Sequence, residues 1–151
     1  MNLDTIKDLI DFAATLDLSD AKSAKEKLDA EFPFDSERVQ QWGELMRVGV
    51  AEGILCDKGK PPMQYSRISK NIPETNNFSC DAVLMNGAGP NHIHPNGEVD
   101  LCFAVDGEPR FDGNEPGWTV YGVGSQHIPT VTGGTMLILY LLPGGALEFV
   151  K

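Results

Sequence analysis

Glycine and proline are distributed very unevenly along this chain. Residues 1–58 contain three of the 16 glycines and one of the 10 prolines, and residues 59–151 contain all the others. Because glycine and proline interrupt regular elements and form turns, the imbalance predicts two differently built parts. We expect an N-terminal helical extension over residues 1–58 and a region of short strands over residues 59–151.

Three amphipathic segments support the helical prediction. Apolar residues recur at spacings of three and four in the first segment, which runs from Leu3 to Leu16 and is preceded by Asn2 as a capping residue. Ser19 is the expected cap of a second helix, and Asp35 or Ser36 that of a third helix that continues to Val50. The apolar faces of these helices are expected to pack into the core.

Short stretches of strand-like pattern fill the rest of the chain. Turn signals separate them, notably Pro95-Asn96-Gly97, Asp106-Gly107, Gly133-Gly134 and Pro143-Gly144-Gly145. The expected strands are 63–69, 79–86, 90–95, 98–105, 117–123, 127–132, 135–142 and 146–150. This number of short strands in so few residues indicates a mainly β, single-domain chain with a closed or sandwiched antiparallel architecture.

Charge and composition exclude several classes of partner. The formal net charge is −10 and the isoelectric point is about 4.6, so nucleic acids and anionic membranes are not expected partners. No apolar run approaches the roughly 18 residues of a membrane span, and the acidic N-terminus does not resemble a signal peptide. The three cysteines lack C-x-x-C spacing and are interpreted as reduced thiols, which predicts a cytoplasmic protein.

Two of the three histidines lie close together in an H-x-H pattern. Side chains alternate along a strand, so His92 and His94 should project from the same face. Glu98 follows the Asn96-Gly97 turn, and His127 lies in a later strand. Three imidazoles and one carboxylate form a set suited to one divalent transition metal ion, with Zn, Fe, Mn, Ni and Cu left as alternatives.

This segment resembles the first motif of the cupin superfamily, through Gly87, His92, His94, Glu98 and Gly107. The second cupin motif is matched by Gly122-Val-Gly124-Ser-Gln-His127, although its proline is missing and Val131 stands where asparagine is usual. The gap from Glu98 to Gly107 is also longer than usual. The resemblance implies a small double-stranded β-helix, or jelly-roll barrel, with the metal inside.

A second resemblance extends over most of the chain. It is carried by Phe34-Asp-Ser-Glu-Arg-Val-Gln-Gln-Trp42, Gly89-Pro-Asn-His-Ile-His94-Pro-Asn-Gly-Glu98, Gly124-Ser-Gln-His127-Ile-Pro-Thr-Val131 and Tyr140-Leu-Leu-Pro-Gly-Gly-Ala-Leu-Glu-Phe149. These segments resemble the 4-hydroxylaminobenzoate lyase family. The resemblance implies release of ammonia from 4-hydroxylaminobenzoate to give 3,4-dihydroxybenzoate, although one scaffold often hosts many chemistries.

The strand after the turn has two chemically distinct faces. If Glu98 faces the metal, Asp100 and Cys102 face the same cavity. Asp100 is therefore a candidate general base, with the alternative that it only orients a histidine. Glu98 is a second candidate for carrying a proton. Cys102 is expected to be an inert thiol. The opposite, apolar face needs a cover, either the N-terminal helices or a second subunit, and we expect a homodimer.

Several further side chains on the expected strands are candidates for binding a small aromatic substrate. They are Tyr65, Arg67, Trp118, Gln126 and Tyr140. A benzoate-like substrate needs a local cation in so acidic a protein. Arg67 is preferred to Arg110 because it lies within an expected strand rather than after a turn.

Two other functions are compatible with the same ligand set. One is an Fe(II)-dependent dioxygenase, whose turnover would need oxygen. The other is a non-catalytic cupin that binds a small molecule and yields no product. A lyase needs neither a nicotinamide nor a flavin, and the sequence contains no fingerprint for either.

Overall fold

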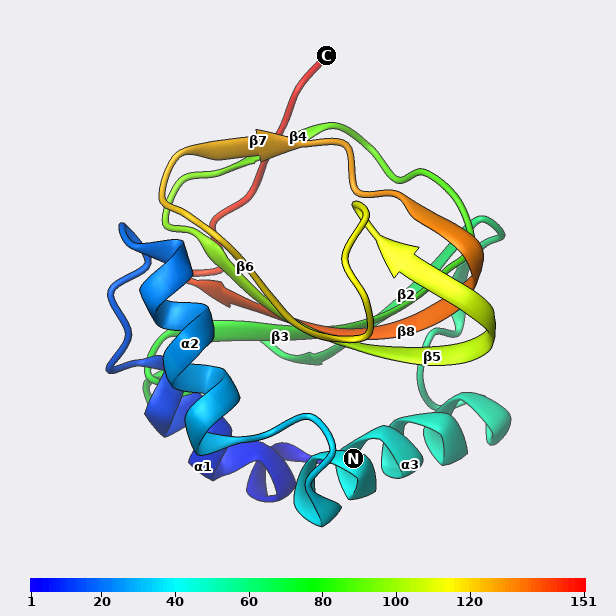
Figure 1. Ribbon diagram of the computed structural model, residues 1–151, viewed down its shortest axis with the longest axis horizontal. Coiled ribbons are helices and arrows are strands. Elements are labelled where there is room, and N and C mark those ends of the chain that lie inside the picture. Colours follow the sequence, from blue (N-terminus) through cyan, green and yellow to red (C-terminus); the bar gives the residue numbers. More distant parts are fainter.

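A computed structural model describes residues 1–151. Three helices come first and nine strands follow (Figure 1), so the prediction of a mainly β chain with an N-terminal extension of about three helices is confirmed. The helices are α1 (Leu3–Ala13), α2 (Ala21–Glu31) and α3 (Glu37–Ala51). The strands are β1 (Lys58–Lys60), β2 (Met63–Ser69), β3 (Phe78–Met85), β4 (His92–His94), β5 (Glu98–Phe111), β6 (Gly117–Tyr121), β7 (Ser125–His127), β8 (Val131–Pro143) and β9 (Glu148–Phe149), with a short 3₁₀ turn at Pro73–Thr75.

Side-chain caps fix where the helices begin. The Asn2 side chain accepts a hydrogen bond from the backbone N–H of Thr5, and the Ser36 hydroxyl accepts one from Val39. The predicted cap Ser19 is wrong by one position, because Asp20 caps α2. The Ser19 hydroxyl instead donates to Asp17, one turn before the helix.

The strands form two sheets that enclose a barrel. The larger sheet has the order β1-β2-β3-β8-β5-β6, and the smaller one has the order β7-β4-β9. Every pairing between neighbouring strands is antiparallel. Figure 1 looks into the space between the sheets, with β4 and β7 opposite the long strands of the larger sheet. The structure thus has the small antiparallel barrel that the first motif implied.

Two predicted turns are β-bulges instead. Asp106-Gly107 and Gly133-Gly134 do not reverse the chain. Gly107 pairs with Gly134 across β5 and β8, and the register shifts on either side of this pairing. A Cβ at Gly107 would lie 2.4 Å from the backbone oxygen of Gly133, and Gly107, Gly133 and Gly134 all have positive φ. The glycines therefore allow a close backbone crossing in a strongly bent pair of long strands. As a result, the predicted strands 127–132 and 135–142 are wrongly bounded.

The three helices cover the outer face of the larger sheet. One hydrophobic cluster contains residues of all three helices together with Val99, Leu101 and Phe103, none of which is exposed to solvent. The apolar face of β5 is thus covered within the same chain. The argument for a second subunit loses its main support, and only Val105, at the end of this face, is 46% exposed. The homodimer stays a prediction.

The inner face of the larger sheet changes from polar to apolar along the barrel. Arg67, Asp81, Tyr140, Asp100 and Thr119 are successive register partners from β2 to β6, so they form one row across the sheet. The next inward row on one side contains Glu98 and Tyr121. Toward the opposite end of the barrel, the last inward row consists of methionines, in which Met85 pairs with Met63 on one side and with Met136 on the other. The acidic groups are therefore concentrated at one end of the interior.

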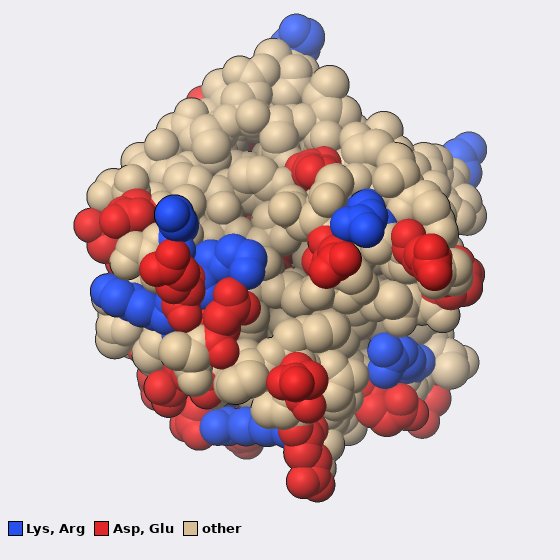
Figure 2. Space-filling view, in the orientation of Figure 1, with Lys and Arg blue, Asp and Glu red and all other residues tan.

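Charged side chains are unevenly distributed over the face seen in Figure 2. In Figure 2 they gather over the lower part of the molecule, whereas the upper part around β4 and β7 is mostly uncharged. None of the helices is both long and apolar enough to cross a membrane.

Candidate metal centre

Two strands of the smaller sheet and the start of β5 bring the predicted ligands together. His92 and His94 project inward from β4, and His127, on β7, is the direct register partner of His92. Glu98 is the first residue of β5, immediately after the predicted turn. His92, His94 and Glu98 are buried, and the His127 side chain is 11% exposed. One ligand atom from each residue lies within 4.8 Å of all the others.

The Nε2 atoms of the three imidazoles point at a common centre. The Nε2 atom of His92 lies 2.9 Å from that of His94 and 3.1 Å from that of His127. Glu98 Oε2 lies 3.2 Å from His94 Nε2 and 3.9 Å from His127 Nε2. Ligand atoms about 2.0–2.2 Å from one ion are separated by about 3 Å when they lie at right angles. The separations of 2.9, 3.1 and 3.2 Å agree with this value, and the separation of 3.9 Å between Glu98 Oε2 and His127 Nε2 corresponds to a wider angle at the ion.

In each imidazole, Nδ1 points away from the common centre, and the hydrogen-bond partner of Nδ1 fixes the tautomer of the ring. His92 Nδ1 lies 2.9 Å from the Pro90 carbonyl oxygen, which can only accept a hydrogen bond. His127 Nδ1 lies 2.6 Å from the Asp112 carboxylate. His94 Nδ1 lies 2.9 Å from the Ser125 hydroxyl, whose single proton is already donated to the Gly122 carbonyl. Each neutral imidazole therefore carries its proton on Nδ1 and presents an Nε2 lone pair inward.

Three converging lone pairs and a carboxylate require a cation. Two unprotonated Nε2 atoms cannot hydrogen bond to each other, so the short contacts between the rings are repulsive unless positive charge lies between them. Glu98 Oε2 is likewise buried without a hydrogen-bond partner. Burial lowers the pKa of His92, which favours the neutral, ligating form. The residues thus fit a divalent transition metal ion.

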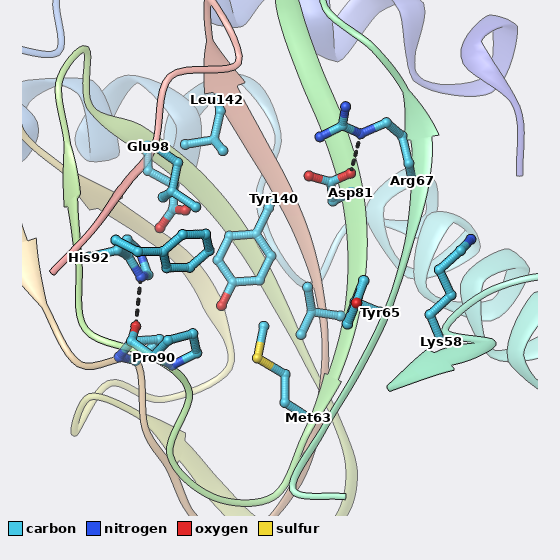
Figure 3. A pocket seen from close by; sticks show the side chains of 14 residues that line it. Lys58, Met63, Tyr65, Arg67, Asp81, Pro90, His92, Glu98, Tyr140 and Leu142 are labelled. Carbon is cyan, nitrogen blue, oxygen red and sulfur yellow. Dashed lines mark hydrogen bonds and ion pairs between the residues drawn. The ribbon is translucent and has the colours of Figure 1, made fainter. Parts of the chain in front are cut away.

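A cavity of about 590 Å³ opens beside this cluster. Figure 3 shows His92 and Glu98 on one side, Tyr140 in the middle, and Arg67, Asp81 and Lys58 on the opposite side. The remaining wall is mostly apolar and is formed by Met63, Val83, Pro90, Pro129, Leu142, Leu147 and Phe149, with Tyr65 at the edge. Apolar walls with a few polar groups are typical of small-molecule sites.

Three of the five predicted substrate-binding residues line this cavity, and two do not. Tyr65, Arg67 and Tyr140 lie in its wall. Gln126 is exposed, and its side-chain amide donates to Asn91 on the outer side of β7. Trp118 is 2% exposed within the cluster beneath the helices, and its ring N–H donates to the Phe32 carbonyl oxygen at 2.8 Å. Trp118 is the register partner of Leu101, so both belong to the outer face.

We expect Trp118→Phe to destabilise the protein without weakening substrate binding. The substitution leaves the buried Phe32 carbonyl without its donor, which costs about 1–3 kcal/mol. Chemical denaturation should therefore show a lower free energy of unfolding. The KM of the folded variant should equal that of the wild type. A KM increase of tenfold or more would place Trp118 in the binding site and contradict its position.

The sequence did not reveal three residues of the site. Asp112 and Ser125 hold the outer nitrogens of His127 and His94, and Lys58 lines the cavity opposite the metal cluster. Ser125 could have been found, because it lies two residues from His127 on the same strand. Asp112 is distant in sequence from every ligand, and its contact with His127 depends on the bend of β5. Lys58 lies in a three-residue edge strand without a distinctive pattern.

Asp100 is completely buried behind the cavity wall. Neither of its carboxyl oxygens has a hydrogen-bond partner, and Thr119 Oγ1, from its register partner, is unpartnered as well. Burial raises the pKa of Asp100 well above its usual range, and the charge of Glu98 raises it further. A proton on Asp100 also removes the repulsion that two ionised carboxylates would exert on each other here. Asp100 is thus suited to holding a proton next to a metal ligand.

All three cysteines are buried and free. Burial raises the pKa of Cys56 and of Cys80 to about 12, and burial together with Asp100 raises the pKa of Cys102. The thiolate is the reactive form. These cysteines therefore have the properties of inert core residues, as predicted for Cys102.

Comparisons with known proteins identify the family of the chain. Residues 5–149 match the family PnbB: 4-hydroxylaminobenzoate lyase. The chain is 30% identical to a 4-hydroxylaminobenzoate lyase of Pseudomonas putida over 93% of this chain and 90% of the relative, and 29% identical to one of Nocardioides sp. (strain LMS-CY) over 76% and 73%. An RmlC-like cupin protein of Ralstonia eutropha JMP134 superposes with a TM-score of 0.46 at 12% identity, covering 64% of this chain and 65% of that chain. The match over nearly the whole chain establishes that this protein belongs to the 4-hydroxylaminobenzoate lyase family of enzymes.

Proposed function

We propose that this protein releases ammonia from 4-hydroxylaminobenzoate and yields 3,4-dihydroxybenzoate, in a metal-dependent reaction of nitroaromatic breakdown. One water molecule enters and one ammonia leaves, so the reaction balances without an external oxidant or reductant. The observation that carries the proposal is the converging His92, His94, Glu98 and His127 cluster at the wall of an apolar cavity of about 590 Å³. The family match supplies the substrate class.

The cavity offers separate places for the two ends of such a substrate. The aromatic ring fits between apolar side chains such as Val83, Leu142 and Phe149. Arg67 and Lys58, opposite the metal cluster, are the cations available to the benzoate carboxylate. Arg67 Nε lies 3.0 Å from Asp81 Oδ1, which orients the guanidinium and leaves its other N–H groups for a ligand. This orientation directs the hydroxylamine toward the metal cluster.

The carboxyl groups of Glu98 and Asp100, next to the metal cluster, carry out the proton transfers. A divalent metal bound by the four ligands supplies Lewis acidity to the N–O group or to water. Glu98 reaches the cavity, and Asp100 lies behind it on the same face of β5. Asp100 therefore exchanges a proton with the site through Glu98 rather than by touching the substrate. The departing amine and the incoming oxygen each require such a transfer.

An anaerobic product assay tests this function. Metal-loaded protein is incubated with 4-hydroxylaminobenzoate without oxygen, and ammonia and dihydroxybenzoate are quantified together. We expect equal amounts of both products at a rate that is unchanged by admitting oxygen. Turnover that appears only with oxygen would instead indicate the dioxygenase. Substrate binding without either product would indicate a non-catalytic binding protein.

We expect Arg67→Ala to raise KM at least about tenfold while changing kcat less than about threefold. A contact to the distant carboxylate stabilises the bound substrate and the transition state alike, and its loss appears mainly in KM. Steady-state kinetics measures both constants. Arg110→Ala is a matched control, because both arginine side chains are 52% exposed and paired with a carboxylate, and Arg110 lies outside the cavity. A kcat decrease larger than the KM increase would contradict a purely binding role.

A further inference from the structure

Asp112 is held in place from three directions although it is not a metal ligand. Its Oδ2 atom lies 2.6 Å from His127 Nδ1 and also accepts a hydrogen bond from the Tyr121 hydroxyl. Its Oδ1 atom accepts the backbone N–H of Thr130 at 2.8 Å. These bonds come from β6, from β7 and from the segment before β8. The carboxylate thus ties together the elements that surround one side of the metal cluster.

The backbone of Asp112 also has an uncommon conformation. Asp112 follows the last residue of β5 in the left-handed region, with a φ of 49°, which aspartate tolerates better than most residues. The neighbouring Phe111 and Asn114 exchange backbone hydrogen bonds across this turn. The turn aims the side chain back toward the barrel interior instead of continuing along the strand.

His127 depends on such support more than the other ligands do. It ends a strand of only three residues, and it is the most exposed of the four ligands. The Tyr121 ring packs against its imidazole with a centroid separation of 4.1 Å. Ring packing restricts the position of the imidazole, but a hydrogen-bond acceptor at Nδ1 is needed to select the tautomer.

We propose that Asp112 is the positioning residue of the metal centre. It holds the His127 proton on Nδ1, so that the Nε2 lone pair faces the ion, and its negative charge strengthens the ligand. Tyr121 assists by donating to the same carboxylate. The inference rests on the metal-binding part of the proposed function, and it does not depend on which reaction the metal supports.

Zn²⁺ affinity of the Asp112→Asn variant tests this role. Carboxylates that hold a metal-bound histidine typically contribute 10- to 100-fold in metal affinity. We therefore expect the dissociation constant for Zn²⁺, measured by competition with a chelating dye, to rise about 10- to 100-fold. Asp106→Asn is the matched control, because Asp106 lies on β5, six residues before Asp112, and likewise accepts a backbone N–H, that of Thr135 at 3.0 Å, away from the cluster. Its Zn²⁺ affinity should equal that of the wild type.

The tautomer of His127 provides a second readout that needs no variant. In metal-free wild-type protein labelled with ¹⁵N-histidine, we expect long-range ¹H–¹⁵N spectra to show His127 protonated on Nδ1. In Asp112→Asn the signal should shift toward a mixture of tautomers, because the amide can also donate to the ring. Protonation of wild-type His127 on Nε2, or equal Zn²⁺ affinities of the Asp112→Asn and Asp106→Asn variants, would overturn the inference. A missing ammonia product would overturn the proposed reaction alone.

Discussion

Replacing His94 by alanine is expected to abolish stoichiometric metal binding and, with it, turnover. The His94 side chain is completely buried, and its Nε2 atom is within 3.2 Å of both His92 Nε2 and Glu98 Oε2. Its removal leaves a cluster with two imidazoles and one carboxylate, separated by the space that the ring occupied. Elemental analysis should show about one metal ion per wild-type chain and almost none in the variant.

The His94→Ala variant should remain folded. Most of the buried apolar residues belong to the cluster between the helices and the larger sheet, away from β4. A chain of this length also buries enough surface to fold without a metal. Far-ultraviolet circular dichroism should therefore remain close to that of the wild type.

Gln126→Ala is a suitable control for the His94 experiment. Gln126 belongs to the same pair of short strands and is the register partner of Ile93, but its side chain is exposed and bonds to Asn91. Its replacement should leave the metal content unchanged. Full metal occupancy in His94→Ala would remove His94 from the ligand set, and equal metal loss in both variants would indicate damage to the small sheet instead.

Three of the four ligands were predictable because their placement depends only on neighbouring residues, through the alternation of side chains along a strand and a short turn. Strand alternation places His92 and His94 on one face, and a two-residue turn returns the chain at Glu98. His127 was included because it is the only other histidine of the chain and lies on a later expected strand, and the resemblance to the second cupin motif agrees with that choice. Alternation around His127 also places Gln126 on the opposite face, so its exclusion from the cavity could have been predicted from the same rule.

The parts that were missed depend on register between distant strands. Trp118 faces outward because it pairs with Leu101, and nothing in either strand alone determines that pairing. Likewise, Asp112 reaches His127 only because bulges at glycines bend β5 and β8. The Asp106-Gly107 and Gly133-Gly134 pairs have the composition of turns, and their role as bulges appears only when the two strands are placed side by side.

The carboxyl group of Asp100 is expected to matter for turnover far more than for metal binding. We expect Asp100→Asn to lower kcat at least about 100-fold, in the range of a lost general acid or base. Asparagine keeps the size of the side chain and, like the protonated acid, carries no charge, so the ligand geometry should persist. It cannot transfer a proton. Metal content and Zn²⁺ affinity should therefore stay close to those of the wild type.

Asp81→Asn distinguishes this role from a general effect of acidic residues in the barrel. Asp81 and Asp100 are the two register partners of Tyr140, one on each side of it in the same row. Asp81 pairs with Arg67 at the opposite wall of the cavity, so its replacement should change KM more than kcat. Asp100 contacts no cation, and the reverse pattern is expected there. Wild-type kcat in metal-loaded Asp100→Asn would show that the buried carboxyl only shapes the site, and the proton would then have to move through Glu98 without it.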